Sequence, residues 1–222
     1  MAKNKGGAPA AASKVSFKAR PKKKLAGKPE TPPPAPRLKT YYDTVVKPQL
    51  LAKGGSAMAV PRLTKCVISM GVGDANENPK KIESLMEDLE AITGQHPHVT
   101  RSRVSVANFK LREGMPVGCA VTLRKALMWE FLDRLIALII PRLRDFRGMN
   151  PKSFDRRGNY NFGLTDQLVF PEINADKVTF QHGMNITLCT TATTDDEARE
   201  LLRLLGFPFR DHEVVITLEA SN

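Results

Sequence analysis

Residues 117–124 read Val-Gly-Cys-Ala-Val-Thr-Leu-Arg, and this stretch decides the fold. Successive side chains of a β-strand point to opposite faces of the sheet. The odd positions therefore place large apolar residues on one face. The even positions place small, polar or cationic residues on the other: Gly118, Ala120, Thr122 and Arg124. One face suits a core, and the other suits a surface of low relief.

Two more segments repeat this pattern. In Thr64–Met70, the side chains of Cys66, Ile68 and Met70 share one face, and those of Lys65, Val67 and Ser69 share the other. In Met184–Ala192, Met184, Ile186 and Leu188 form the apolar face. The second face could simply be solvated, as is common in antiparallel sheets. However, solvated faces usually carry long charged side chains, whereas Gly, Ala, Ser and Thr let another macromolecule approach closely.

The remaining periodicities predict helices between further strands. Apolar residues recur at helical spacing in Tyr41–Lys53, in the segment between Asn78 and Gly94, and in Ala126–Ile140. A capping box, Thr194 to Glu197, opens a last helix. Further strands are predicted at Val99–Phe109 and Leu164–Phe170. Hairpin connections mixed with helices indicate an α+β fold with a largely antiparallel sheet, helices on one face and an exposed face for docking RNA.

The chain divides into three parts by composition. Residues 1–40 hold 11 basic residues, one acidic residue and seven of the 16 prolines, so we expect a disordered, basic Lys/Pro/Ala-rich extension. Residues 41–211 are expected to form one α+β domain, and residues 212–222 a C-terminal extension. The N-terminal extension suits a polyanion, although a merely solubilising role is the simpler alternative.

Several classes of protein are excluded by what the sequence lacks. Its three cysteines, Cys66, Cys119 and Cys189, are too few and too far apart for a disulfide framework or a zinc site, which indicates reduced thiols. The longest aliphatic run, Leu135–Ile140, is six residues, whereas a membrane span needs about 20. Gly71–Asn76 lacks the last glycine of a dinucleotide loop. We expect no catalytic residues, metal or cofactor, and therefore no enzyme.

Positive charge is concentrated in the middle of the domain. Residues 99–160 carry 13 basic and five acidic residues, a local charge of +8. Residues 41–98 carry −1 and residues 161–222 carry −6. Ten of the 13 basic residues are arginines, whose planar guanidinium pairs with two phosphate oxygens at once. This patch indicates a nucleic-acid partner.

Ordered motifs across residues 41–211 resemble a known family. Five of them are Val60-Pro-Arg-Leu-Thr-Lys65, Met70-Gly-Val-Gly73, Ile92-Thr-Gly-Gln95, Pro141-Arg-Leu-Arg-Asp-Phe-Arg-Gly148 and Phe207-Pro-Phe-Arg210. Between them stand the strings 103–112, 114–119, 121–124, 128–131 and 153–160. Together they resemble the universal large-subunit ribosomal protein five family in its bacterial form.

The resemblance implies a structural role in the cytoplasmic ribosome. Members of the family bind 5S rRNA, attach it to 23S rRNA in the central protuberance, contact the P-site tRNA and bridge to small-subunit ribosomal protein thirteen. It also implies an α+β fold with an exposed sheet face, no membrane partner and no free homo-oligomer. A general basic architectural nucleic-acid binder is the alternative function.

Three groups of candidate site residues follow from the motifs and the charge map. The rRNA-binding group is Lys65, Ser69, Gln95, Arg101, Arg103, Phe109, Thr122 and Arg124. The loop expected to contact tRNA contains Lys110, Arg112, Gly114 and Met115. The group expected at rRNA or at the inter-subunit bridge is Arg142, Arg144, Arg147, Arg156, Arg157 and Tyr160. Ser69 departs from the family pattern, which usually has Asn, and offers fewer hydrogen bonds there.

Overall fold

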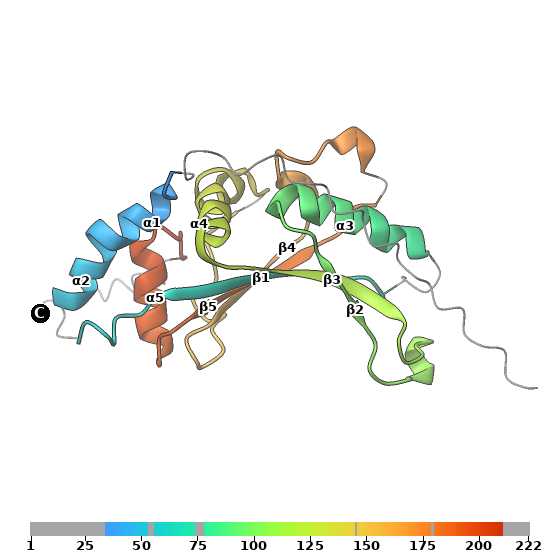
Figure 1. Cartoon of the computed structure of the whole chain (residues 1–222), viewed down its shortest axis with the longest axis horizontal. Helices are drawn as coiled ribbons and strands as arrows, with labels where there is room; N and C mark the ends of the chain where they lie inside the picture. The colour runs from blue at the N-terminus through green and yellow to red at the C-terminus, as the bar shows by residue number, and fades with distance from the viewer. Residues whose placement is uncertain (1–33, 53–55, 74–77, 145, 179, 211–222) are drawn as a thin grey trace, which may run out of the picture. The chain divides into compact units, whose positions relative to one another are not determined.

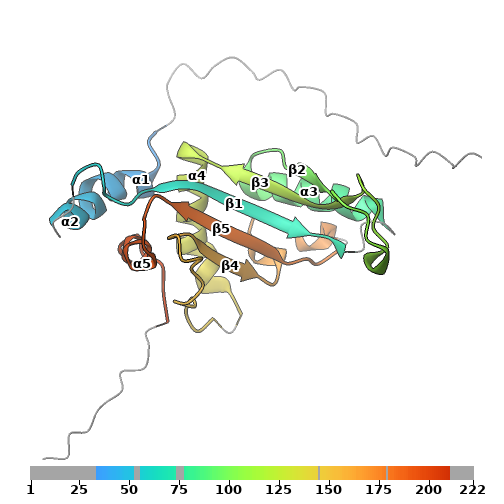
Figure 2. The same cartoon turned by 90° about the horizontal axis from the view of Figure 1, so that it is seen from below.

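A computed structural model describes residues 34–52, 56–73, 78–144, 146–178 and 180–210 (Figures 1 and 2). The described residues from Ala35 onward form one compact unit. Most of the predicted N-terminal extension, the whole extension 212–222 and the strand considered at 214–218 lie outside the described residues.

A five-stranded antiparallel sheet is the centre of the fold. Its strand order is β2-β3-β1-β5-β4. The strands are β1 Leu63–Gly71, β2 His98–Arg101, β3 Pro116–Leu123, β4 Tyr160–Leu164 and β5 Met184–Thr190. The α+β class and the antiparallel pairing are confirmed.

The register of the strands confirms the alternation in the sequence. Ile68 of β1 lies opposite Val121 of β3 and Ile186 of β5, and all three side chains are buried. Its neighbour Val67 lies opposite Thr122 and Thr187, whose side chains are only half-buried. Each strand therefore contributes to one apolar and one mostly polar face.

Helices cover the apolar face. The helix α3, Pro79–Thr93, and the helix α4, Lys125–Arg134, lie on one side of the sheet (Figure 1). At one end of the sheet are α1 Arg37–Tyr41, α2 Lys47–Ala52 and α5 Asp195–Leu204 (Figure 2). A π-helical turn, Tyr42–Val46, joins α1 to α2, and another, Leu135–Ile139, continues α4 into the 3₁₀ turn Ile140–Arg142.

The ends of two helices follow their sequence signals. Helix α3 begins at Pro79, after Asn78, and ends at Gly94, which adopts φ of 69°. In α5 the Thr194 hydroxyl accepts a hydrogen bond from the Glu197 amide at 3.4 Å. The Glu197 carboxylate in turn accepts from the Thr193 amide at 3.2 Å, so the cap is reciprocal but displaced by one residue.

Two strand predictions were wrong in extent or position. The segment predicted as a strand at Val99–Phe109 pairs regularly only as far as Arg101, because Ala107–Phe109 forms a 3₁₀ turn. The strand predicted at Leu164–Phe170 lies earlier, and β4 ends at Leu164. The sequence does alternate earlier, since Tyr160, Phe162 and Leu164 face the core side with Asn161 and Gly163 between them.

A buried amide explains why the chain turns after β4. Gln167 begins a 3₁₀ turn and is fully buried. Its Nε2 donates to the Asp88 carboxylate at 2.9 Å and to the Phe180 carbonyl at 3.0 Å. This side chain ties the segment after β4 to α3, and an extended strand over the same residues could not make both contacts.

Candidate nucleic-acid interface

The face of the sheet opposite to α3 and α4 is uncovered by any helix among the described residues (Figure 2). We call it the open face. Lys65, Ser69 and Thr122, three of the predicted rRNA-binding residues, lie on it, and all three are half-buried. The structure therefore brings them together on neighbouring strands β1 and β3.

The open face is low because its central residues are small. Gly118 lies so close to β1 that a Cβ atom there would come within 2.3 Å of the Met70 carbonyl oxygen. Ala120 lies beside it on β3, opposite Ser69 on β1. No long side chain rises at these positions, so a flat or convex partner can approach the backbone closely.

Strand β5 adds polar groups that the sequence-based list of site residues did not include. Asn185 lies directly opposite Ser69, and Thr187 lies opposite Val67. Asn161 of β4 pairs in turn with Thr187. The alternation placed these residues on the polar face, but only the strand order shows that they continue the surface formed by β1 and β3.

Two predicted rRNA-binding residues lie at the ends of elements rather than within the sheet. Gln95 follows Gly94 at the end of α3 and is half-buried. Arg124 lies at the end of β3, directly before α4, and is exposed. Both residues are described, but neither forms part of the central rows of the open face.

The connection between β2 and β3 projects on the side away from the helices (Figure 1). Its base is closed by backbone hydrogen bonds between Ser102 and both Gly114 and Met115. The Arg101 guanidinium also donates to the Gly114 carbonyl at 2.9 Å. Near its tip, Val106 and Leu111 form one isolated β-bridge. We call residues 102–115 the hairpin tip.

The hairpin tip presents apolar and cationic side chains to solvent. Phe109 is 72% exposed and Val104 is 66% exposed. Three basic residues are exposed around them: Arg103, Lys110 and Arg112. The chain reverses through Lys110 and Gly114, whose φ angles are 52° and 82°. An exposed aromatic ring among cations is typical of surfaces that bind nucleic acid.

The loop before β4 holds two arginines in a defined conformation. The Asp155 carboxylate accepts hydrogen bonds from the Asn159 side chain at 2.7 Å and from the Arg157 amide at 2.9 Å. These bonds, that of the Asn159 side chain above all, hold the pKa of Asp155 below its ordinary value. Arg156, between them, has φ of 65°, and both arginines are exposed.

The last predicted group divides between surface and core. Arg142, Arg144 and Arg147 are exposed in the segment after α4. Tyr160 is instead buried, with 1% of its surface exposed. Its hydroxyl donates to the Asn150 carbonyl at 2.9 Å, and its ring packs against Phe154 at a centroid distance of 4.8 Å. The structure thus places Tyr160 in the core and not among the contacts proposed for rRNA or the bridge.

Comparison with known proteins identifies the relatives of this chain. Residues 56–112 match the family described as ribosomal protein L5, and residues 116–209 match the family described as the C-terminus of the same ribosomal protein. The large ribosomal subunit protein uL5 of Thermobifida fusca is 55% identical over 181 residues, which are 81% of this chain and 95% of that protein. The uL5 of Streptomyces griseus is 56% identical over 180 residues, which are 80% of this chain and 97% of that protein.

The chain belongs to the uL5 family of large ribosomal subunit proteins. The two uL5 matches meet at the hairpin tip. The first covers β1, α3, β2 and most of the tip, and the second begins with β3 and ends at Phe209. Both halves of the open face therefore belong to the part shared with the family.

The three thiols of this uL5 chain are protonated at neutral pH. Burial raises the pKa of Cys66 and Cys119, the latter to about 11. Partial burial also raises the pKa of Cys189, against the opposing effect of Lys65 across the strand pair. Within the described residues, no three His, Cys, Asp or Glu side chains group to hold a metal ion, and no helix could span a bilayer.

Proposed function

We propose that this uL5 protein binds 5S rRNA on the open face and attaches it to 23S rRNA in the central protuberance. One observation carries the proposal: a sheet face of small and polar residues, uncovered by helices within the described part, in a chain of this family. Lys65, Ser69 and Thr122 lie on this face and Gln95 and Arg124 lie at the ends of neighbouring elements.

The mechanism is adhesive rather than catalytic. Lysine and arginine neutralise phosphates and release counterions, which supplies most of the affinity. The low centre around Gly118 and Ala120 lets the RNA backbone approach the sheet, and hydroxyls and amides then bond to sugar and phosphate oxygens. We therefore propose a structural component of the ribosome and not an enzyme.

The two projecting loops suit the other partners of the proposal. The hairpin tip, with Phe109 exposed among cations, would contact the P-site tRNA. The ordered loop with Arg156 and Arg157, together with Arg142, Arg144 and Arg147, would meet rRNA or small-subunit ribosomal protein thirteen. Their separation on the molecule allows these contacts to form at the same time as the open face holds 5S rRNA.

Competition between nucleic acids tests the proposal. The full chain is titrated with labelled 5S rRNA in the presence of excess unrelated duplex DNA, over a series of salt concentrations. We expect 5S rRNA to remain bound and its affinity to fall steeply with salt. Displacement by the duplex at equal concentration would support the alternative, a general basic architectural binder, and would refute the specific assignment.

The proposed tRNA contact has a separate test. Phe109→Ala leaves the core intact because the ring is exposed, so the free energy of unfolding should change by less than about 0.5 kcal/mol. Binding of 5S rRNA should be unchanged, whereas ribosomes reconstituted with this variant should hold P-site tRNA more weakly. Equal retention of tRNA by both ribosomes would remove the tip from the proposal.

A further inference from the structure

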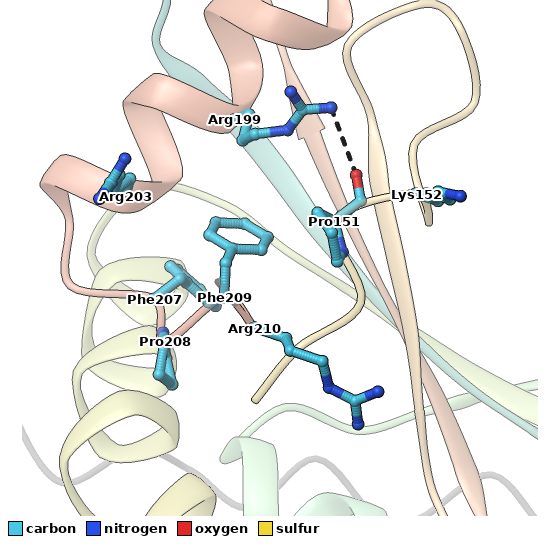
Figure 3. A pocket seen from close by; sticks show the side chains of 8 residues that line it. All are labelled: Pro151, Lys152, Arg199, Arg203, Phe207, Pro208, Phe209 and Arg210. Atoms are coloured by element: carbon cyan, nitrogen blue, oxygen red, sulfur yellow. Dashed lines mark hydrogen bonds between the residues drawn. The ribbon is translucent and has the colours of Figure 1, made fainter. Parts of the chain in front are cut away.

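A cationic pocket lies beside α5, outside the sheet (Figure 3). It has a volume of about 490 Å³. Its lining combines four basic and four apolar residues: Lys152, Arg199, Arg203, Arg210, Pro151, Phe207, Pro208 and Phe209. No lining residue belongs to a strand, so this α5 pocket is a different surface from the open face.

The composition of the pocket is unexpected for its part of the chain. Residues 161–222 carry a net charge of −6 and contain only four basic residues. Three of these four, Arg199, Arg203 and Arg210, line the pocket, where they meet Lys152 from the loop before β4. Folding thus gathers the cations of an acidic segment at one place, which no count along the sequence reveals.

The pocket is held in shape by local structure. Arg199 and Arg203 are four residues apart on α5 and therefore share one side of the helix. The segment after α5 pairs with residues 147–150: Met149 donates to the Pro208 carbonyl at 2.8 Å, and Arg210 donates to the Met149 carbonyl at 2.9 Å. A Cβ at Gly148 would lie 2.8 Å from the Arg210 amide nitrogen, so this close approach requires glycine.

The arginines of the pocket are incompletely paired within the described protein. Arg199 donates to Asp196 at 2.9 Å and to the Pro151 carbonyl at 3.4 Å, but its buried Nε has no partner. No described carboxylate pairs with Lys152, Arg203 or Arg210. The Arg210 side chain donates to the Arg147 carbonyl, at 3.3 Å. A cavity with unmatched donors and no acidic lining residue calls for an anion.

We propose that the α5 pocket binds an RNA strand, with its phosphates held by the four cations and a base against the apolar floor. Guanidinium groups match the paired oxygens of phosphate, and three of the four cations are arginines. Pro208 is exposed and Phe209 half-buried, so they offer apolar surface to a nucleotide. The inference rests on the proposed function in that it adds a second RNA site to an rRNA-binding protein.

The test uses the full chain saturated with 5S rRNA, so that the open face is occupied. A labelled uridine decanucleotide containing 4-thiouridine is then added, irradiated, and its crosslinks are located by mass spectrometry. We expect crosslinks within residues 207–210. Arg203→Gln with Arg210→Gln should abolish them and weaken binding of the decanucleotide about tenfold, with the salt slope reduced by about 1.4 for two lost phosphate contacts.

A matched double variant controls for loss of charge alone. Lys47→Gln with Lys80→Gln removes two exposed cations of α2 and α3, outside the pocket, and should leave the crosslinks in place. Crosslinks that are absent, or that persist in the arginine variant, would overturn the inference. So would a glutamate decapeptide that displaces the oligonucleotide at equal concentration, since the pocket would then fit an acidic protein.

The two proposals fail separately. If 5S rRNA binds but no crosslink reaches the pocket, the inference is overturned and the open-face proposal stands. If the pocket crosslinks while 5S rRNA fails to bind in a separate titration, the open-face proposal is overturned and the pocket remains an RNA site. Both double variants should retain the wild-type affinity for 5S rRNA within about twofold, a change that amounts to roughly 0.4 kcal/mol.

Discussion

The two faces of the sheet are built from alternate residues of the same strands, yet they obey different constraints. On the covered face, Ile68, Val121 and Ile186 form a buried row under the helices. On the open face, the adjacent row is Thr122, Val67 and Thr187, all half-buried. The covered face stabilises the fold, and the open face is free to be chosen for its partner.

This difference teaches where substitutions should act. A change on the covered face alters the free energy of unfolding, because it removes buried apolar surface. A change one residue away points to the opposite side and should alter RNA affinity while stability stays nearly constant. Neighbouring positions of one strand can therefore separate folding from binding.

The largest effect is expected at the centre of the covered face. Ile68→Ala removes a fully buried side chain and should lower the free energy of unfolding by about 3 kcal/mol. Urea denaturation measures the loss. The matched variant Val67→Ala, on the open face of the same strand, should cost only about 1 kcal/mol because Val67 is already half-exposed. Equal losses would contradict the division of the two faces.

The next effect is on binding. Thr122→Glu places a carboxylate on the open face, where it would repel phosphate, and should weaken 5S rRNA binding by about 2 kcal/mol, roughly 30-fold. Thr122→Val keeps the branched shape and should cost about 1 kcal/mol through the lost hydroxyl. Fluorescence titration measures both. Wild-type affinity in the glutamate variant would show that RNA binds elsewhere.

A smaller effect is expected from the cation at the end of the face. Lys65→Gln should reduce the slope of log affinity against log salt by about 0.7 to 0.9, the value for one phosphate contact. The unfolding free energy should change by less than about 0.5 kcal/mol, as for other accessible side chains. Lys80→Gln on α3 serves as the control and should leave the slope for 5S rRNA unchanged.

The smallest effect concerns pH and the loop before β4. Because hydrogen bonds lower the pKa of folded Asp155, its carboxylate stabilises the loop above its unfolded pKa, and this contribution is lost as the pH falls through the folded value. Hydrogen exchange at the Arg157 and Asn159 amides should thus quicken in acid, after correction for intrinsic rates. Asp155→Asn should show fast exchange without this pH dependence. A protected, pH-independent loop in the wild type would contradict the assignment.

Patterns repeated over neighbouring residues were predictable from the sequence. The alternation in β1, β3 and β5 and the apolar stripes of α3 and α4 specify the layers, since each pattern has one period. The segment after β4 was misread because the buried amide of Gln167 decides its path through contacts with α3. No local pattern contains that information.

The candidate site was predictable only where it follows a strand. Lys65, Ser69 and Thr122 were placed on one face by parity, and strand pairing confirms that they are neighbours. Tyr160 could not be assigned from sequence, because an aromatic residue among cations suits a core as well as a surface. The α5 pocket was missed, since it joins Lys152 to arginines about 50 residues later in an acidic segment.

The lateral strands of the sheet have one further consequence. Strand β2 is only four residues long and its pairing shifts register at Arg101. On the other side, the Asn161 amide of β4 already donates to the Ser153 carbonyl at 3.1 Å. Short or occupied borders give a second copy few backbone groups to pair with, which opposes aggregation. A newly made molecule can therefore keep its bare sheet in solution until RNA arrives.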